Sequence, residues 1–188
     1  MPKPISCLTD YLKSRMEKIN FFSDEYARES PRSDRRFGLV DGIQQGENGT
    51  MARTTLENEE DWNAVVTNET GKAMTFMPLD HNIVIHPTPD TTYSLCDGML
   101  YDSNKDFLAF IELKVRKESW VNEAVTQLRS TIELFSENHD ISEYRKCVAY
   151  AANKKHPHFN SSHKEIMQNF RNDTKFRLLI QNNIEVAP

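Results

Sequence analysis

The chain has 188 residues, 38% hydrophobic and 27% charged, with 23 Lys and Arg against 28 Asp and Glu and a formal net charge of −5. This composition is that of an ordinary globular protein, and it excludes collagen-like, coiled-coil and compositionally disordered chains. The length suits one domain. No apolar run is long enough to cross a bilayer, and Met1–Ser6 lacks a secretory pattern, so we expect a cytoplasmic or nuclear protein with no membrane partner.

The charges are unevenly distributed along the chain. Residues 141–188 carry eight Lys and Arg against four Asp and Glu, and a second, looser basic group lies within 32–53. An acidic net charge counts against a protein that coats nucleic acid nonspecifically. It does not exclude a nuclease, because a metal ion in a cleft attracts phosphate even on an acidic protein. The three cysteines are far apart and have no zinc or redox spacing, so we expect reduced thiols at Cys7, Cys96 and Cys147.

The first third of the chain has the less regular pattern. Apolar residues recur at three- and four-residue steps over 5–22, which predicts a helix. Residues 23–37 are polar and predict a loop, and the glycines after it indicate turns or a hairpin. Three further short elements are predicted: a helix at 57–66 and strands at 73–77 and 82–86.

The pattern is clearer from Thr92 onward. Residues 92–101 and 107–116 predict two strands joined by a turn at 102–106. The second run is apolar on both faces until Glu112, which is typical of a central strand covered from both sides. Residues 119–137 predict an amphipathic helix that Ser119 would cap. A buried strand at 146–152, a helix at 161–171 and a strand at 176–180 follow. This order indicates an α/β or α+β layered domain.

Two carboxylates and an amine fall together in the predicted hairpin. Side chains two apart in a strand share a face, so Glu112 and Lys114 point the same way. If Asp102 lies opposite Phe107, then Asp97 lies directly across from Glu112. A slip of one residue would place the two acids on opposite faces. A chemical role therefore requires this particular register.

These residue types suit phosphodiester hydrolysis. Two carboxylates bind Mg²⁺ or Mn²⁺ through hard oxygens, and the Leu113 carbonyl would supply another oxygen. Such a metal polarises phosphate and activates water, and Lys114 would hold that water or stabilise the developing charge. A lone Glu-x-Lys in a strand is usually a solvated face. Here it ends a strand that is otherwise buried, where an unpaired charge is costly.

The string Cys96-Asp97-Gly98, then Glu112-Leu113-Lys114, then a helix with Gln127 resembles the core of the PD-(D/E)xK nuclease superfamily. The resemblance covers about 90–152. It implies a restriction-endonuclease-like fold within a single domain spanning 1–188, with a three-layer core whose mixed central sheet is flanked by helices. It makes 23–72 an insertion or N-terminal elaboration. It also implies metal-dependent cleavage of DNA or, less often, RNA, a homodimer, and an orienting role for Gln127.

Several points depart from that pattern or remain open. The family's proline before the first acid is Cys96 here, while a literal Pro-Asp pair occurs at Pro89-Asp90, which makes Asp90 the alternative first ligand. The family's opening helix sometimes contributes an acid, for which Glu17 and Glu25 are candidates. A noncatalytic nucleic-acid-binding or regulatory module on the same fold is the second functional hypothesis, since fold alone does not decide function. A metal-dependent hydrolase of small nucleotides is the third.

Overall fold

A computed structural model describes residues 19–41, 50–85, 93–116, 119–155 and 163–186. These residues form a mixed α/β structure with two sheets and two α-helices. Neither of the described helices is long and apolar enough to cross a membrane. The helix predicted at 5–22 lies mainly outside the described residues, and its described part, 19–22, is not helical.

The main sheet has five strands in the order β4-β5-β6-β7-β8. Neighbours are antiparallel from β4 to β6 and parallel from β6 to β8. The central strand is β6, whose first seven residues are all buried, as the two-sided apolar run predicted. The strands span Thr75–Pro78 (β4), Gly98–Tyr101 (β5), Phe107–Lys114 (β6), Lys146–Asn153 (β7) and Arg177–Ile180 (β8).

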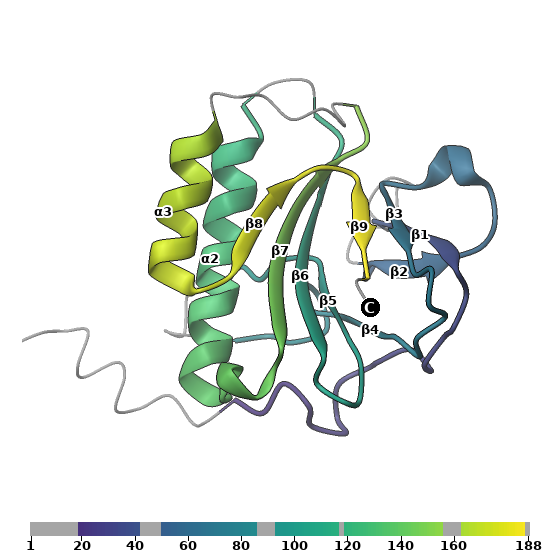
Figure 1. The fold of residues 1–188 in the computed structure, drawn as a ribbon, viewed down its shortest axis with the longest axis horizontal. Helices are drawn as coiled ribbons and strands as arrows, with labels where there is room; N and C mark the ends of the chain where they lie inside the picture. Colours follow the sequence, from purple (N-terminus) through teal and green to yellow (C-terminus); the bar gives the residue numbers. More distant parts are fainter. Residues whose placement is uncertain (1–18, 42–49, 86–92, 117–118, 156–162, 187–188) are drawn as a thin grey trace, which may run out of the picture.

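The two faces of β6 belong to two different cores. Leu108 and Phe110 pack in the cluster that includes the helices, whereas Phe107, Ala109 and Ile111 pack in the cluster that includes the second sheet. Figure 1 shows the resulting layers, with α2 and α3 on one side of the main sheet and the small sheet on the other. The alternation of a strand places Glu112 and Lys114 on the helix side.

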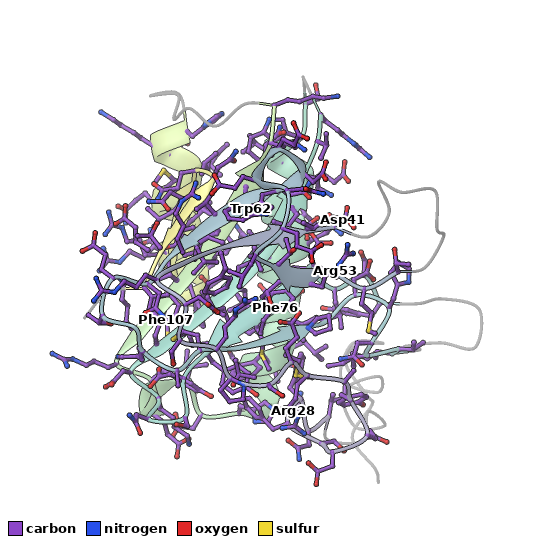
Figure 2. All side chains as sticks on the ribbon, turned by 90° about the vertical axis from the view of Figure 1, so that its right-hand side faces the viewer. Arg28, Asp41, Arg53, Trp62, Phe76 and Phe107 are labelled. Carbon is purple, nitrogen blue, oxygen red and sulfur yellow. The ribbon has the colours of Figure 1, made fainter. Side chains whose placement is uncertain are left out.

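The second sheet has the order β2-β1-β3-β9 and covers the face opposite the helices. The segment 23–72, expected to be an elaboration, contributes three of its strands, and the parallel partner β9 comes from the end of the chain. Figure 2 looks toward this side, with Trp62 above Phe76 and Phe107. The predicted α/β class is confirmed; in the described residues both helices lie on one face of the mixed main sheet, and the second sheet covers the other face. The strands span Arg36–Val40 (β1), Arg53–Thr55 (β2), Ala64–Thr67 (β3) and Asn183–Glu185 (β9).

Two short elements differ from their predictions. The helix predicted at 57–66 is wrong: a 3₁₀ turn at Glu59–Asp61 is followed by β3. The β-branched run Val65-Val66-Thr67 favours a strand, and pairing with both β1 and β9 fixes it there. The described part of the strand predicted at 82–86 is irregular and begins with a turn, in which the Asn82 side chain donates hydrogen bonds to the carbonyls of Ala27 and Pro78.

The helices α2 (Val121–Asn138) and α3 (Lys164–Thr174) agree with the predicted positions within a few residues. The predicted apolar stripe of α2 lies in the core, with Leu128, Ile132 and Phe135 fully buried. Ser119 does not cap α2, because it adopts a φ of 54° and the N-cap position is held by Trp120 without a side-chain hydrogen bond.

Candidate functional site

The hairpin register aligns the two candidate acids. Gly98 pairs with Ile111 and Tyr101 with Leu108, so the same register continued by one residue sets Asp97 opposite Glu112, as predicted. Asp97 itself lies in a bend just before β5. Its Oδ2 accepts a hydrogen bond from the Leu113 main-chain N–H at 2.6 Å, which holds this carboxylate at the end of β6.

Glu112 and Lys114 meet on the helix side of the sheet. The Lys114 Nζ lies 2.7 Å from Glu112 Oε1, and the side chains are 12% and 3% exposed, respectively. The second oxygen, Glu112 Oε2, is buried and has no partner with full hydrogen-bond geometry among the described residues, although the Asp97 main-chain N–H lies near enough to the carboxylate to lower its pKa. A buried carboxylate oxygen left without a partner is costly unless another group binds it. This oxygen is therefore the clearest sign of a missing ligand.

The first turns of α2 supply the remaining partners of Lys114. Gln127 Oε1 accepts a hydrogen bond from Lys114 Nζ at 2.9 Å, so the helix position expected from the resemblance does face the acids. Glu123 Oε1 accepts a second one at 2.9 Å, and the other oxygen of this carboxylate, Oε2, pairs with Arg116 at 2.6 Å. We had not predicted Glu123. Its spacing of four residues before Gln127, which puts both on one helix face, is the signal that could have identified it.

Burial dominates the electrostatics of the two acids. Desolvation raises the pKa of Glu112 from 4.5 to about 7, although the Lys114 ammonium and the Asp97 main-chain N–H lower it, and the charge of Asp80 adds a smaller increase. Desolvation and the neighbouring Glu112 charge raise the pKa of Asp97 well above its usual value, with a smaller contribution from Asp41. A bound cation would relieve this repulsion. Asp41 was not predicted, and Asp80 was considered only as a weak candidate ligand; they follow β1 and β4, and their charges act on the acids through the tertiary arrangement.

Lys114 remains charged in this environment. Burial alone would lower the pKa of its ammonium, but the Glu112 and Glu123 carboxylates together raise it above the ordinary value. The ammonium is thus a fixed positive charge held by side chains from both β6 and α2.

The donor set fits a hard divalent cation. Because an extended residue points its N–H and C=O to the same edge of the strand, the Leu113 carbonyl faces the Asp97 side. Mg²⁺ and Mn²⁺ prefer oxygen ligands. The site offers the carboxylates of Asp97 and Glu112 and the Leu113 carbonyl. Within the described residues, no group of three His, Cys, Asp or Glu side chains is close enough to hold a metal by itself. Solvent and the substrate's own oxygens would complete the coordination shell.

Of the alternative acids, the structure describes only Glu25. Asp90 and Glu17 lie outside the described residues, and Glu25 is exposed in an irregular segment. Cys96 is a buried free thiol whose pKa is raised by desolvation and by the neighbouring acids, so it is an inert core residue. Comparisons with family models, curated proteins and solved structures found no match to this chain.

Proposed function

We propose that the chain is a metal-dependent nuclease that hydrolyses phosphodiester bonds, most simply in DNA. The observation that carries the proposal is Glu112 Oε2, a buried carboxylate oxygen with no hydrogen-bond partner in the described structure, beside Asp97 and Lys114. Asp97, Glu112 and the Leu113 carbonyl would hold Mg²⁺ or Mn²⁺. When bound, such an ion supplies Lewis-acid polarisation of the phosphate and lowers the pKa of water.

The protein's own groups would divide the remaining work. Lys114 presents a fixed ammonium that orients the attacking water and stabilises charge developing on the phosphate. Gln127 and Glu123 hold that ammonium in place, because both accept hydrogen bonds from Nζ at 2.9 Å. The Leu113 N–H fixes the Asp97 carboxylate before any ligand arrives. Such preorganisation reduces the cost of assembling the site during the reaction.

The restriction-endonuclease-like core belongs to the same proposal. Its support is the succession of three antiparallel strands (β4, β5, β6), then α2, then β7 parallel to β6, with the acids at the β5–β6 hairpin. The small sheet β2-β1-β3-β9 would be an elaboration that covers the second face. A homodimer able to cut both strands of a duplex remains a prediction from the resemblance.

A noncatalytic nucleic-acid-binding module is the second candidate, favoured by one observation. The Lys114 ammonium is already bound by Glu112, Glu123 and Gln127. Among the described residues, no group of three His, Cys, Asp or Glu side chains is placed to hold a metal ion. A lysine held by these three side chains would not be available for catalysis, and the protein would bind nucleic acid without cleaving it. Calorimetric titration with Mn²⁺ separates the candidates, because a nuclease requires one site-specific cation and the module requires none.

The proposed activity is tested by incubating the full chain with supercoiled plasmid, single-stranded DNA and RNA. We expect cleavage with Mg²⁺ or Mn²⁺ and none in EDTA. The Asp97→Asn variant should lose cleavage by roughly 100-fold or more, because it removes one of two anionic ligands. Asp61→Asn, which changes an exposed carboxylate in the 3₁₀ turn, serves as the matched control. Cleavage that persists equally in Asp97→Asn would contradict the assignment.

A further inference from the structure

A basic groove lies between α3 and the edge strand β8, away from the candidate acids. It encloses about 290 Å³, with Lys164, Gln168, Arg171 and Arg177 around it and Met167 and Leu178 as its apolar part. On α3, residues 164, 167, 168 and 171 follow the helical spacing of one face, so the helix contributes a continuous wall. Over the seven residue steps from Lys164 to Arg171 that wall is roughly 10 Å long.

The cations of this groove have no charged partner in the part of the chain that the structure describes. None of Lys164, Arg171 and Arg177 has a salt bridge or side-chain hydrogen bond among the described residues. The acid nearest to Arg171 in the sequence, Asp173, is paired with Arg129. Glu165 follows Lys164 directly and therefore points about 100° away around the helix. Among the described residues, the three cations that line this groove therefore have no ion-pair partner, which is a local exception to the acidic net charge of the chain.

The groove begins at the same end of the molecule as the candidate site. β6 and β7 are parallel and both end at the edge of the sheet that carries Lys114 and Asn153. Figure 1 shows α2 and α3 both starting at this end of the molecule and running side by side. Lys164 opens α3, so the basic wall begins at the same end as the acids and extends away from them along the helix.

We propose that this α3–β8 groove binds the sugar-phosphate backbone of the nucleic acid whose phosphodiester bond reaches the Asp97–Glu112 site. The inference rests on the proposed function. Lys and Arg side chains neutralise phosphates and release counterions irrespective of sequence. The apolar part of the groove suits the sugar edge, and no base-reading element is required. Three of the basic residues that give 141–188 its local positive charge would thus bind phosphates in this groove.

The test compares two triple variants of the full chain that remove equal charge. One is Lys164→Gln/Arg171→Gln/Arg177→Gln. The control is Arg35→Gln/Arg53→Gln/Arg145→Gln, which changes three exposed arginines outside the groove. Binding of a labelled duplex and a labelled single strand is measured by fluorescence anisotropy in EDTA across a salt series, and cleavage with Mn²⁺ is measured in parallel.

We expect the groove variant to bind duplex about tenfold more weakly, with the slope of log K against log salt reduced by about 2.7, or 0.9 per lost phosphate contact. The control should bind like the wild type. Equal duplex binding by the two variants would overturn the groove assignment. A lack of duplex binding by both the wild type and the control would also overturn it, even if the groove were then found to bind an acidic protein. Metal-dependent cleavage by the wild type, together with unchanged binding and cleavage by the groove variant, would refute only the proposed role of the groove. Groove-dependent binding without any cleavage would refute only the nuclease.

Discussion

Replacing Lys114 with alanine is expected to lower the rate of DNA cleavage by roughly 100- to 1,000-fold, the effect of removing one charge-stabilising donor from an active site. The Nζ is the only cation in contact with Glu112 among the described residues, and Glu123 and Gln127 hold it there. Removing it takes away both the water-orienting group and the stabilising charge. Single-turnover cleavage with Mn²⁺ measures the chemical step directly.

The assay must allow for the effect of Lys114 on its neighbour. The ammonium lowers the pKa of Glu112, so its loss makes that carboxyl harder to ionise. Rates should therefore be compared at pH 8 and above, where the loss of activity should persist if Lys114 acts in the reaction itself. The control is Lys105→Ala, which removes another paired lysine. Lys105 lies in the turn at the far end of the hairpin and is bound to Glu143, so its loss should leave the rate unchanged. Recovery of Lys114→Ala to wild-type rates at high pH would show that Lys114 only tunes Glu112.

Replacing Glu112 with glutamine is expected to abolish metal binding and yet stabilise the metal-free protein at alkaline pH. The pKa of Glu112 is about 7 in the folded state, against an ordinary value of 4.5. A folded acid with a raised pKa binds protons more tightly than the unfolded chain. The stability it contributes is therefore fully present below about pH 4.5 and is lost as the pH rises through about 7. Glutamine cannot ionise and escapes this loss.

The pH dependence gives the size of this effect. Between pH 4 and pH 8, the free energy of unfolding of the glutamine variant relative to the wild type should rise by about 3 kcal/mol, from 1.36 kcal/mol for each pKa unit. Denaturant unfolding at several pH values measures it, with the exposed Glu60→Gln as the control. Saturating Mn²⁺ should raise the wild-type Tm at pH 8 and leave that of Glu112→Gln unchanged. A constant stability difference across this pH range would contradict the buried, ionisable state of Glu112.

The parts of the fold set by local pattern could be predicted from the sequence. The two-sided apolar run of β6 and the stripe of α2 identified the central strand and its covering helix. The turn at 102–106 fixed the register, because the Asp102 side chain accepts a hydrogen bond from the Phe107 N–H and closes the hairpin as expected. That register, together with the alternation of strand side chains, was enough to bring Asp97, Glu112 and Lys114 together.

The remainder depends on contacts between distant segments. β9 is three residues long and has its place only because it pairs with β3, more than 100 residues away in the sequence. The run 57–66 begins with acidic residues compatible with a helix start and ends with β-branched residues that favour a strand, and the pairing of β3 with β1 and β9 decides between the two. Likewise Asp80 and Asp41 carry no local signal of their influence on the acids, which arises from the packing of β4 and β1 around the hairpin.

A crystal structure of the full chain grown with Mn²⁺ tests the central claim most directly. We expect one anomalous peak, about 2.2 Å from Glu112 Oε2 and within ligand distance of Asp97 and the Leu113 carbonyl. The paired Glu112→Gln crystal should lack it. The absence of anomalous density at saturating Mn²⁺, with Glu112 Oε2 turned toward another side chain, would contradict cation binding at this site and with it the proposed hydrolytic activity.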